Sequence, residues 1–419
     1  MNLEKHNPHW KEHFVYPFTL DRNIFKLLSK NISNRPIVTI SGLRRTGKTV
    51  LMQQLINTLL QEKIDRTHIL YYSFDEEQPK IEEIVQAFEK LTNIDKNKTK
   101  LYVFFDEIQK LEDWQNQIKY YYDTSTIKFF VSGSSSLFIQ KKSKESLAGR
   151  SFDFYLSPLS FREFLVFRKK EALITKDKLF QGELKKEFAL YIKRQFVETV
   201  DEHEEFITSY VKSILEKVVY IDIPKVFAID HQDLLMRLLK IIASNPGMII
   251  EYESLARELG INRTTLSNYL FYLEEAFLIK KIYNFSRNRI TSEKKLKKFY
   301  LSSTSFFPYL SPETDESKLI ENLVAIETHS KFFWRTPFKD EVDFVLEKFH
   351  NQEICPVEVK YKNTISAKDA KTLISFCKKM DLNEGIIITK DLEEKKLFTK
   401  DNKHITIHFI PVWKFLLSL

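Results

Sequence analysis

The sequence predicts an α/β protein of several domains, and three observations lead to this fold class. A β-branched apolar run, a glycine-containing loop and an amphipathic helix follow one another over residues 36–60. A fully apolar run over 100–106 ends in carboxylates, which is typical of a strand buried on both faces of a parallel sheet. Residues 316–389 read as a helix, strands, a second helix and a last apolar strand. With 419 residues, the chain can build two or three hydrophobic cores.

The composition suggests an acidic partner and a reducing compartment. The net charge of +8 and the pI of about 9.0 favour a partner such as nucleic acid, although Lys-rich solubility explains them equally well. The two cysteines, Cys355 and Cys377, belong to no CxxC pair, which argues against a disulfide framework or a zinc site. No apolar run resembles a signal peptide or a membrane span. We therefore expect a soluble, cytoplasmic protein with no membrane partner.

The run PIVTISGLRRTGKTVLMQQLINTLL carries a phosphate-binding loop. It matches G-x-x-x-x-G-K-[ST] in the strand–loop–helix context that this motif requires. Backbone N–H groups of such a loop, together with the helix N-terminus, bind phosphate oxygens. Lys48 would reach the β- and γ-phosphates, and the Thr49 hydroxyl would bind Mg²⁺. The expected nucleotide-binding residues are Gly42, Leu43, Arg44, Arg45, Thr46, Gly47, Lys48 and Thr49.

Two acidic residues end the apolar strand KLYVFFDE, which lies one strand–helix unit after HILYYSFDEE. Ligands of parallel sheets collect at the carboxyl ends of the strands, so this strand end and the loop should face the same site. We expect Asp106 to hold Mg²⁺ through water and Glu107 to orient the attacking water.

The fourth strand, KFFVSGSSS, ends in hydroxyl side chains. Ser132 and Ser134 lie where a polar residue could sense the γ-phosphate, and a turn-forming serine cluster is the alternative. The loop that follows contains Arg150, which could act as a finger at the nucleotide of a neighbouring subunit in a homo-oligomer. A surface or ion-paired arginine is the alternative there.

The motif order GLRRTGKT, VFFDEIQ, VSGSSS, LAGR and LSPLSFREFL resembles the prokaryotic AAA-like P-loop ATPases that carry a C-terminal domain of unknown function related to restriction endonucleases. The resemblance covers nearly the whole chain, and the paired Arg44 and Arg45 and the phrase LSPLSFREFL are distinctive of that group. It implies ATP hydrolysis with ATP and Mg²⁺ as cofactors. The roles carried over fall on Lys48, Thr49, Asp106, Glu107, Ser132, Ser134 and Arg150.

The middle of the chain predicts a charged helical linker and then a winged helix. In SNPGMIIEYESLARELGINRTTLSNYLFYLEE, Ser254 would cap a first helix that Gly260 ends, and Asn262 would cap a second helix. The basic run FSRNRITSEKKLKKFY would form a wing that grips phosphates. An inert spacer or a protein-docking domain is the alternative to DNA binding. Polar residues of the second helix that suit base edges or phosphates are Arg263, Thr264, Thr265, Ser267, Asn268 and Tyr269.

Acidic residues recur at a set order near the C-terminus. The helix over 316–330 carries Glu321, and the second of two strands in FFWRTPFKDEVDFVLEK carries Asp343. In PVEVK, Glu358 and Lys360 share one face because residues two apart on a strand do so. A helix over 366–380 and the strand GIIIT follow. An E-x-K pair alone is most often a solvated ion pair.

This order of elements resembles the PD-(D/E)xK nuclease core. The resemblance places Glu321, Asp343 and Glu358 as ligands of a divalent ion at the scissile phosphate. It places Lys360 as the group that positions the nucleophile or stabilises the transition state. In the ATPase group an Asp and a Gly usually follow a K-x-Y strand, whereas FYLSSTSFF has serines at those places.

Two hypotheses of different classes follow for the whole protein. The first is an ATPase coupled to a metal-dependent DNA nuclease, with the winged helix guiding the DNA. The second is an ATP-controlled DNA- or protein-binding switch whose nuclease-like domain no longer cuts. The expected domains are an AAA-like P-loop ATPase domain over 1–165, a helical linker over 166–240, a winged helix over 241–300 and a PD-(D/E)xK-like domain over 301–419.

Overall fold

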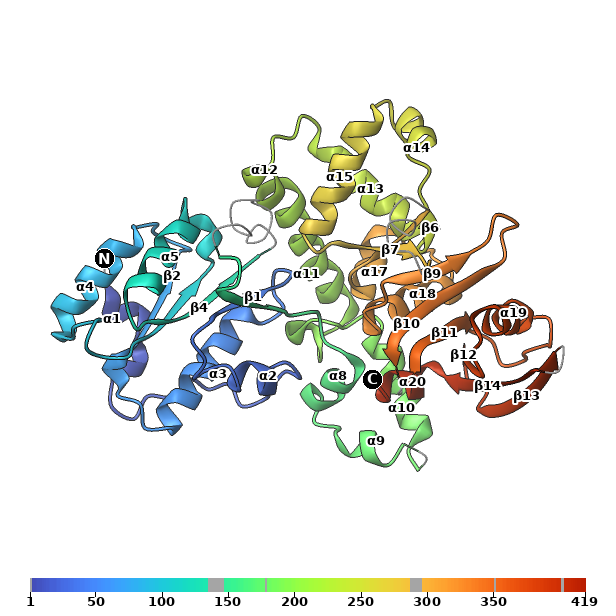
Figure 1. Cartoon of the computed structure of the whole chain (residues 1–419), viewed down its shortest axis with the longest axis horizontal. Helices are drawn as coiled ribbons and strands as arrows, with labels where there is room; N and C mark the ends of the chain where they lie inside the picture. The colour runs from blue at the N-terminus through green and yellow to red at the C-terminus, as the bar shows by residue number, and fades with distance from the viewer. Residues whose placement is uncertain (1, 135–146, 178, 287–295, 350–351, 401–402) are drawn as a thin grey trace. The chain divides into compact units, whose positions relative to one another are not determined.

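The computed structural model describes residues 2–134, 147–177, 179–286, 296–349, 352–400 and 403–419. The chain forms two compact units, Met1–Pro158 and Leu159–Leu419 (Figure 1). The predicted α/β class, with an N-terminal parallel sheet, a helical middle and a further sheet near the C-terminus, is confirmed. Among the described residues, no helix is both long and apolar enough to cross a membrane.

The first unit is built on a five-stranded parallel sheet with the strand order β2-β3-β4-β1-β5. Helices connect successive strands from β1 to β4 (Figure 1). In the sheet, β1 lies between β4 and β5, so the chain passes β4 and β3 on its way from β1 to β2. The strands are β1 Ile37–Ser41, β2 Ile69–Ser73, β3 Tyr102–Asp106, β4 Lys128–Gly133 and β5 Ser151–Tyr155. The helices are α1 Leu3–His6, α2 Phe25–Ser29, α3 Lys48–Gln61, α4 Ile81–Thr92 and α5 Trp114–Thr124.

Alternate residues of each strand pack into two separate apolar layers. Val103 and Phe105 lie in the core that contains α4 and α5, whereas Phe104 lies in the core that contains α2 and α3. The ring of Phe104 stacks on Phe130 at 4.4 Å between centroids, which ties β3 to its neighbour β4. Because helices cover both faces here, β3 and β4 are buried along their whole length, and their polar side chains lie at the strand ends.

The second unit begins with helices. They are α8 Phe161–Phe167, α9 Ala172–Thr175, α10 Gln181–Tyr191, α11 Glu204–Lys217, a π-helical turn Val218–Asp222, α12 Ile223–Val226 and α13 Gln232–Ser244. The later helices are α14 Tyr252–Leu259, α15 Arg263–Glu275, α17 Phe307–Leu310, α18 Glu316–Glu327, α19 Lys371–Met380 and α20 Val412–Leu417.

One nine-stranded sheet runs through this unit in the order β13-β14-β12-β11-β10-β9-β7-β8-β6. The parallel pairing of Tyr283 with Phe332 joins β7 to β9, so strands of the predicted winged-helix and nuclease-like segments form one sheet. The predicted division into four domains stays a prediction. The strands are β6 Met248–Ile249, β7 Ile279–Asn284, β8 Lys297–Leu301, β9 Phe332–Arg335, β10 Glu341–Phe349, β11 Gln352–Lys360, β12 Glu384–Thr389, β13 Glu394–Lys400 and β14 Lys403–Pro411.

Several local predictions need correction. Ser254 lies inside α14, which begins at Tyr252, so it does not cap that helix. The helix expected over 366–380 begins only at Lys371, because Asp369 accepts hydrogen bonds from the Ser366 backbone and hydroxyl and holds the preceding residues in a turn. Much of the predicted wing, residues 287–295, lies outside the described residues.

Candidate functional site

The phosphate-binding loop lies between the end of β1 and the start of α3. Gly42 needs its missing side chain, because a Cβ atom there would lie 2.3 Å from the Leu156 carbonyl oxygen. Gly47 precedes the helix with φ of 97°, a conformation that favours glycine. Lys48 is buried, and its Nζ donates to the carbonyls of Gly42 and Leu43 at 3.0 Å each. The ammonium is therefore held within the loop.

The Asp106 carboxylate accepts hydrogen bonds from residues of four different segments of the first unit. Its Oδ2 accepts hydrogen bonds from Thr49 Oγ1 at 2.6 Å and from Tyr71 hydroxyl at 2.9 Å. Its Oδ1 accepts from the Ser132 hydroxyl and from the Glu107 backbone N–H. Burial, and then the Asp106 charge, raises the pKa of Tyr71, so its hydroxyl stays protonated as a donor. Four donors hold a buried carboxylate at the strand end.

The side-chain oxygens of Thr49 and Asp106 are suitable ligands for a hard divalent cation. A hydroxyl and a carboxylate, from Thr49 and Asp106, meet directly beside the loop that carries Lys48. Oxygen donors of this kind are the ligands that Mg²⁺ prefers, and a site with few protein ligands leaves positions for phosphate oxygens and water. Sequence reasoning missed Tyr71, which lies on the neighbouring strand β2 and is indistinguishable from a core aromatic in the sequence.

Glu107 and Ser134 are linked through a residue that the sequence did not single out. Gln109 Nε2 donates to Glu107 Oε2 at 2.5 Å and to Ser134 Oγ at 3.1 Å. Glu107 has φ of 53°, which turns the chain out of β3 into the short helical turn that carries Gln109. No local pattern marks Gln109, because its contact with Ser134, which lies 25 residues later, depends on the pairing of β3 with β4.

Arg22 is a second residue that sequence reasoning missed. Its guanidinium is buried and donates to the carbonyl of Thr46 at 2.7 Å and to the carbonyl of Ser157 at 2.8 Å. It therefore clamps the phosphate-binding loop to the segment after β5. No local pattern marks it, since its partners are backbone atoms distant in the sequence.

Arg150 forms an ion pair with Asp123, with Nε and Oδ1 3.0 Å apart. Its carbonyl accepts from the Ile37 N–H at the start of β1, whereas the loop follows the other end of that strand. A five-residue strand is about 13 Å long, so the Arg150 backbone lies about that far from the phosphate-binding loop of the same chain, at the other end of β1. A role as a finger in a neighbouring subunit stays a prediction.

In the second unit, the structure brings the four predicted C-terminal residues into one buried cluster. Lys360 Nζ lies 2.7 Å from Glu358 Oε1, and Asp343 Oδ2 accepts from the Val359 N–H at 2.9 Å. Glu321, on α18, reaches the same cluster through Lys298. Burial, followed by the neighbouring carboxylates, raises the pKa of both Asp343 and Glu358.

Lys298 occupies the middle of this cluster. Its Nζ lies 2.5 Å from Glu341 Oε1, 3.3 Å from Glu321 Oε1 and 3.7 Å from Asp343 Oδ1. Burial opposes ionisation of Glu321, but the charges of Lys298 and Lys318 outweigh it and lower the pKa of that acid. The prediction that this part of the basic run grips phosphate is wrong for Lys298, because its side chain is only 3% exposed.

The metal-binding role of Glu321, Asp343 and Glu358 stays a prediction. Within the described parts of the chain, no group of three or more His, Cys, Asp or Glu side chains is arranged to hold a metal ion. Each of the three acids instead has a lysine within 3.7 Å. Cys355 and Cys377 are both buried, and neither forms a disulfide.

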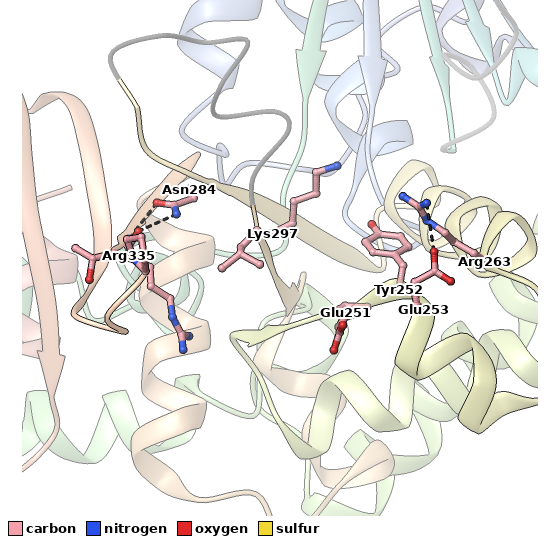
Figure 2. Close-up of a pocket in the computed structure, with 11 residues that line it drawn as sticks. Glu251, Tyr252, Glu253, Arg263, Asn284, Lys297 and Arg335 are labelled. Atoms are coloured by element: carbon pink, nitrogen blue, oxygen red, sulfur yellow. Dashed lines mark hydrogen bonds and ion pairs between the residues drawn. The ribbon is translucent and has the colours of Figure 1, made fainter.

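A groove of about 590 Å³ opens beside α14 and α15 (Figure 2). Arg263, Lys297 and Arg335 supply positive charge, and Glu251 and Glu253 supply negative charge. Arg335 comes from β9, outside the segment that the sequence assigned to the winged helix, and its backbone exchanges hydrogen bonds with the Asn284 side chain. Figure 2 shows Lys297 between the Arg335 side of the groove and the Arg263 side.

The second helix of the predicted pair presents only part of its polar face. Asn262 caps α15 by accepting from the Thr265 N–H at 2.8 Å, and Gly260 ends α14 with φ of 71°, as predicted. Tyr269 is buried, and its hydroxyl accepts from the His231 N–H at 3.3 Å, so the prediction that it faces DNA is wrong. The exposed residues are Arg263, Thr264, Ser267 and Asn268.

Comparison with sequence families first defines the class of the first unit. Residues 34–165 match the family described as an AAA domain, which agrees with the parallel sheet, the loop and the hydrogen bonds of Asp106. This part of the chain is an AAA-type domain. Residues 195–317 match the Domain of unknown function (DUF8612), and residues 316–415 match the Domain of unknown function (DUF4143).

Particular relatives extend over most of the chain. The uncharacterized protein MJ1544 of Methanocaldococcus jannaschii is 28% identical over 408 residues, covering 93% of this chain and 90% of the relative. An uncharacterized protein of Haemophilus influenzae is 25% identical, covering 84% of this chain and 88% of the relative.

Solved structures resemble the chain only loosely. The Aeropyrum pernix Orc1 protein in complex with DNA has a TM-score of 0.31 at 13% identity, covering 74% of this chain and 97% of that chain. The AMPPCP-bound DnaA of Aquifex aeolicus has a TM-score of 0.31 at 14% identity, covering 64% of this chain and 92% of that chain. Because these scores are low, the class of the first unit rests on its strand order, its loop and the family match.

Proposed function

We propose that the protein is an ATP-hydrolysing switch that binds DNA through its second unit. The observation that carries the proposal is the convergence of Lys48, Thr49, Asp106 and Ser132 at one sheet edge of an AAA-type domain. A triphosphate needs an ammonium, a cation-binding pair and backbone N–H groups at a helix start, and this edge supplies all three.

Each residue has a separate part in turnover. Lys48 would bind the β- and γ-phosphates, and Thr49 and Asp106 would hold Mg²⁺, which neutralises phosphate charge when bound. Glu107 would orient the attacking water, with Gln109 holding its carboxylate in place. Ser132 would sense the presence of the γ-phosphate, and its hydrogen bond to Asp106 would couple it to the cation-binding residues.

DNA binding is proposed for the region of α14, α15 and the groove. The order helix, short strand, two helices and two antiparallel strands supports a winged helix, since β6 pairs with β8 and β8 pairs with β7. The exposed Arg263, Ser267 and Asn268 at the start of α15 suit phosphates and base edges. Lys297 extends the positive charge along the groove.

Metal-dependent DNA cleavage is a second candidate. The observation in its favour is that Glu321, Asp343, Glu358 and Lys360 lie in one buried cluster, as a PD-(D/E)xK-like site would require. The position of Lys298 within the cluster weighs against it.

Two assays on the full-length chain separate these functions. Plasmid DNA is incubated with Mg²⁺ or Mn²⁺, with and without ATP; absence of nicking supports the switch, and nicking abolished by Asp343→Ala supports the nuclease. Duplex binding is then measured at two salt concentrations for Arg263→Ala/Lys297→Ala, with the exposed Lys395→Ala as control. We expect weaker binding and a shallower salt dependence for the double variant only. Equal binding by all three proteins would refute the DNA-binding proposal.

A further inference from the structure

Lys298 is an ammonium buried among acids where a divalent ion would otherwise be expected. It lies on β8, its side chain is 3% exposed, and its Nζ is within 3.7 Å of carboxylate oxygens of Glu321, Glu341 and Asp343. These acids come from α18 and from β10, so one cation holds two elements against β8.

The sequence places Lys298 inward by strand alternation. Lys298 and Tyr300 are two residues apart on β8 and share a face, and the Tyr300 hydroxyl donates to Glu321 Oε1 at 2.8 Å. Lys297 points the other way and lines the groove shown in Figure 2. Both lysines belong to the same basic run, but Lys298 forms ion pairs with the buried acids, whereas Lys297 lines the groove.

The charges of the cluster balance without a metal. With every group ionised, Glu321, Glu341, Asp343 and Glu358 carry four negative charges, and Lys298, Lys318, Arg335 and Lys360 carry four positive ones, each paired within 3.7 Å. A divalent ion added to this set would leave two uncompensated positive charges in a buried site, which is unfavourable.

Backbone also closes over one side of the cluster. Gly247 has φ of +79°, and a Cβ there would lie 2.6 Å from Glu321 Oε1 and 2.9 Å from the Tyr300 hydroxyl. Its N–H donates to the Phe299 carbonyl at 2.8 Å, which fixes this backbone against β8. The side of Glu321 that faces Gly247 is therefore closed to a phosphate group.

We propose that the Lys298 ammonium is the resident cation of this cluster and takes the position that a divalent ion would otherwise occupy. The acids are thereby kept together as a structural joint between β8, α18 and β10, and the cluster does not take up Mg²⁺ or Mn²⁺. This inference does not depend on the nucleotide chemistry of the first unit.

Counting bound Mn²⁺ in the nucleotide-free, full-length protein tests the proposal. The proteins compared by calorimetry and by the Mn²⁺ electron paramagnetic resonance signal are the wild type, Asp343→Asn, Lys298→Met, Lys298→Met/Asp343→Asn and the control Lys297→Met. We expect the wild type, Asp343→Asn and Lys297→Met to bind the same number of Mn²⁺ equivalents. Lys298→Met should gain one equivalent, which the double variant loses.

Two results would overturn the proposal. One is a wild-type chain that binds an equivalent of Mn²⁺ which Asp343→Asn abolishes; the other is a folded Lys298→Met chain that gains none. If Lys298→Met does not fold, the comparison of the wild type with Asp343→Asn decides alone, because equal uptake supports a resident ammonium and unequal uptake refutes it.

Discussion

The hydroxyl of Thr49 donates a 2.6 Å hydrogen bond to Asp106 Oδ2 across 57 residues of sequence. This bond joins the first turn of α3 to the end of β3. Because the same carboxylate also accepts from Ser132, the loop, the acid and the hydroxyl at the end of β4 form one connected site. A change in any of them should therefore be measurable as a change in ATP binding or turnover.

Lys48→Ala should abolish most ATP turnover. The buried ammonium is the positive side chain that the structure holds inside the loop, so its loss removes stabilisation of the phosphate charge. Loss of one such preorganised donor costs on the order of 10²–10³ in kcat. Phosphate release by Lys48→Ala is compared with that by Lys90→Ala, an exposed lysine on α4. Unchanged turnover in Lys48→Ala would show that the site assignment is wrong.

Glu107→Gln should bind nucleotide but turn it over slowly. Among the described residues, the Glu107 carboxylate accepts a hydrogen bond from Gln109 and none from the phosphate-binding loop. We expect a fall in kcat of roughly 10²-fold or more, with nucleotide affinity nearly unchanged, because general-base assistance contributes about 10²–10⁴-fold. Fluorescent-nucleotide titration and phosphate release measure the two quantities, with the exposed Glu112→Gln as control. A parallel loss of affinity would contradict a role confined to turnover.

Gly247→Ala should destabilise the second unit. Alanine at φ of +79° costs about 1–2 kcal/mol in backbone conformation, and its Cβ would lie 2.6 Å from Glu321 Oε1. Gly182, in α10, meets nothing within 4 Å, so Gly182→Ala should be neutral or stabilising by up to about 1 kcal/mol. Urea unfolding of both variants provides the comparison. Equal stability of the two would mean that the Gly247 backbone does not press on the acid cluster.

His9 should make the first unit less stable in mild acid. Burial lowers the pKa of His9 to about 4, while its ring nitrogens lie 3.1 Å from the Tyr16 hydroxyl and the Ile69 carbonyl. The unfolded chain, with a histidine pKa of about 6.5, binds the proton more readily, so this stability is complete above pH 6.5 and is lost as the pH falls toward 4. The loss is at most about 3 kcal/mol.

Unfolding free energies over this pH range are measured for the wild type, His9→Gln and the exposed His13→Gln. Only His9→Gln should show a shallower decline with falling pH. A decline as steep as that of the wild type would assign the acid sensitivity to other groups.

Local pattern was sufficient wherever function lies close in sequence. The loop from Gly42 to Thr49, the strand that ends in Asp106 and the alternation of Glu358 with Lys360 could all be read from spacing, because strand and helix periods fix which residues share a face or an end. The helix pair around Gly260 and Asn262 was read in the same way, from capping chemistry.

Local pattern failed where burial depends on a distant partner. Lys298 and Tyr269 looked like groups for DNA, yet one is enclosed by acids from α18 and β10 and the other bonds to His231. Glu321 is 23 residues from Lys298, and His231 is 38 residues from Tyr269, so no local pattern shows either contact. The same reason hid Tyr71 and Gln109, whose roles depend on which strand lies beside β3.

The sequence by itself determined which reactive groups are present: a phosphate-binding loop, the acid Asp106 at the end of an apolar strand, and a set of C-terminal acids with one lysine. Only the tertiary structure decided how that second set is neutralised, because it pairs β8 with β7 and packs α18 so that Lys298 meets Glu321 and Asp343. Charges that are far apart along the chain interact strongly only after folding removes the water between them, and strand pairing selects which of them meet.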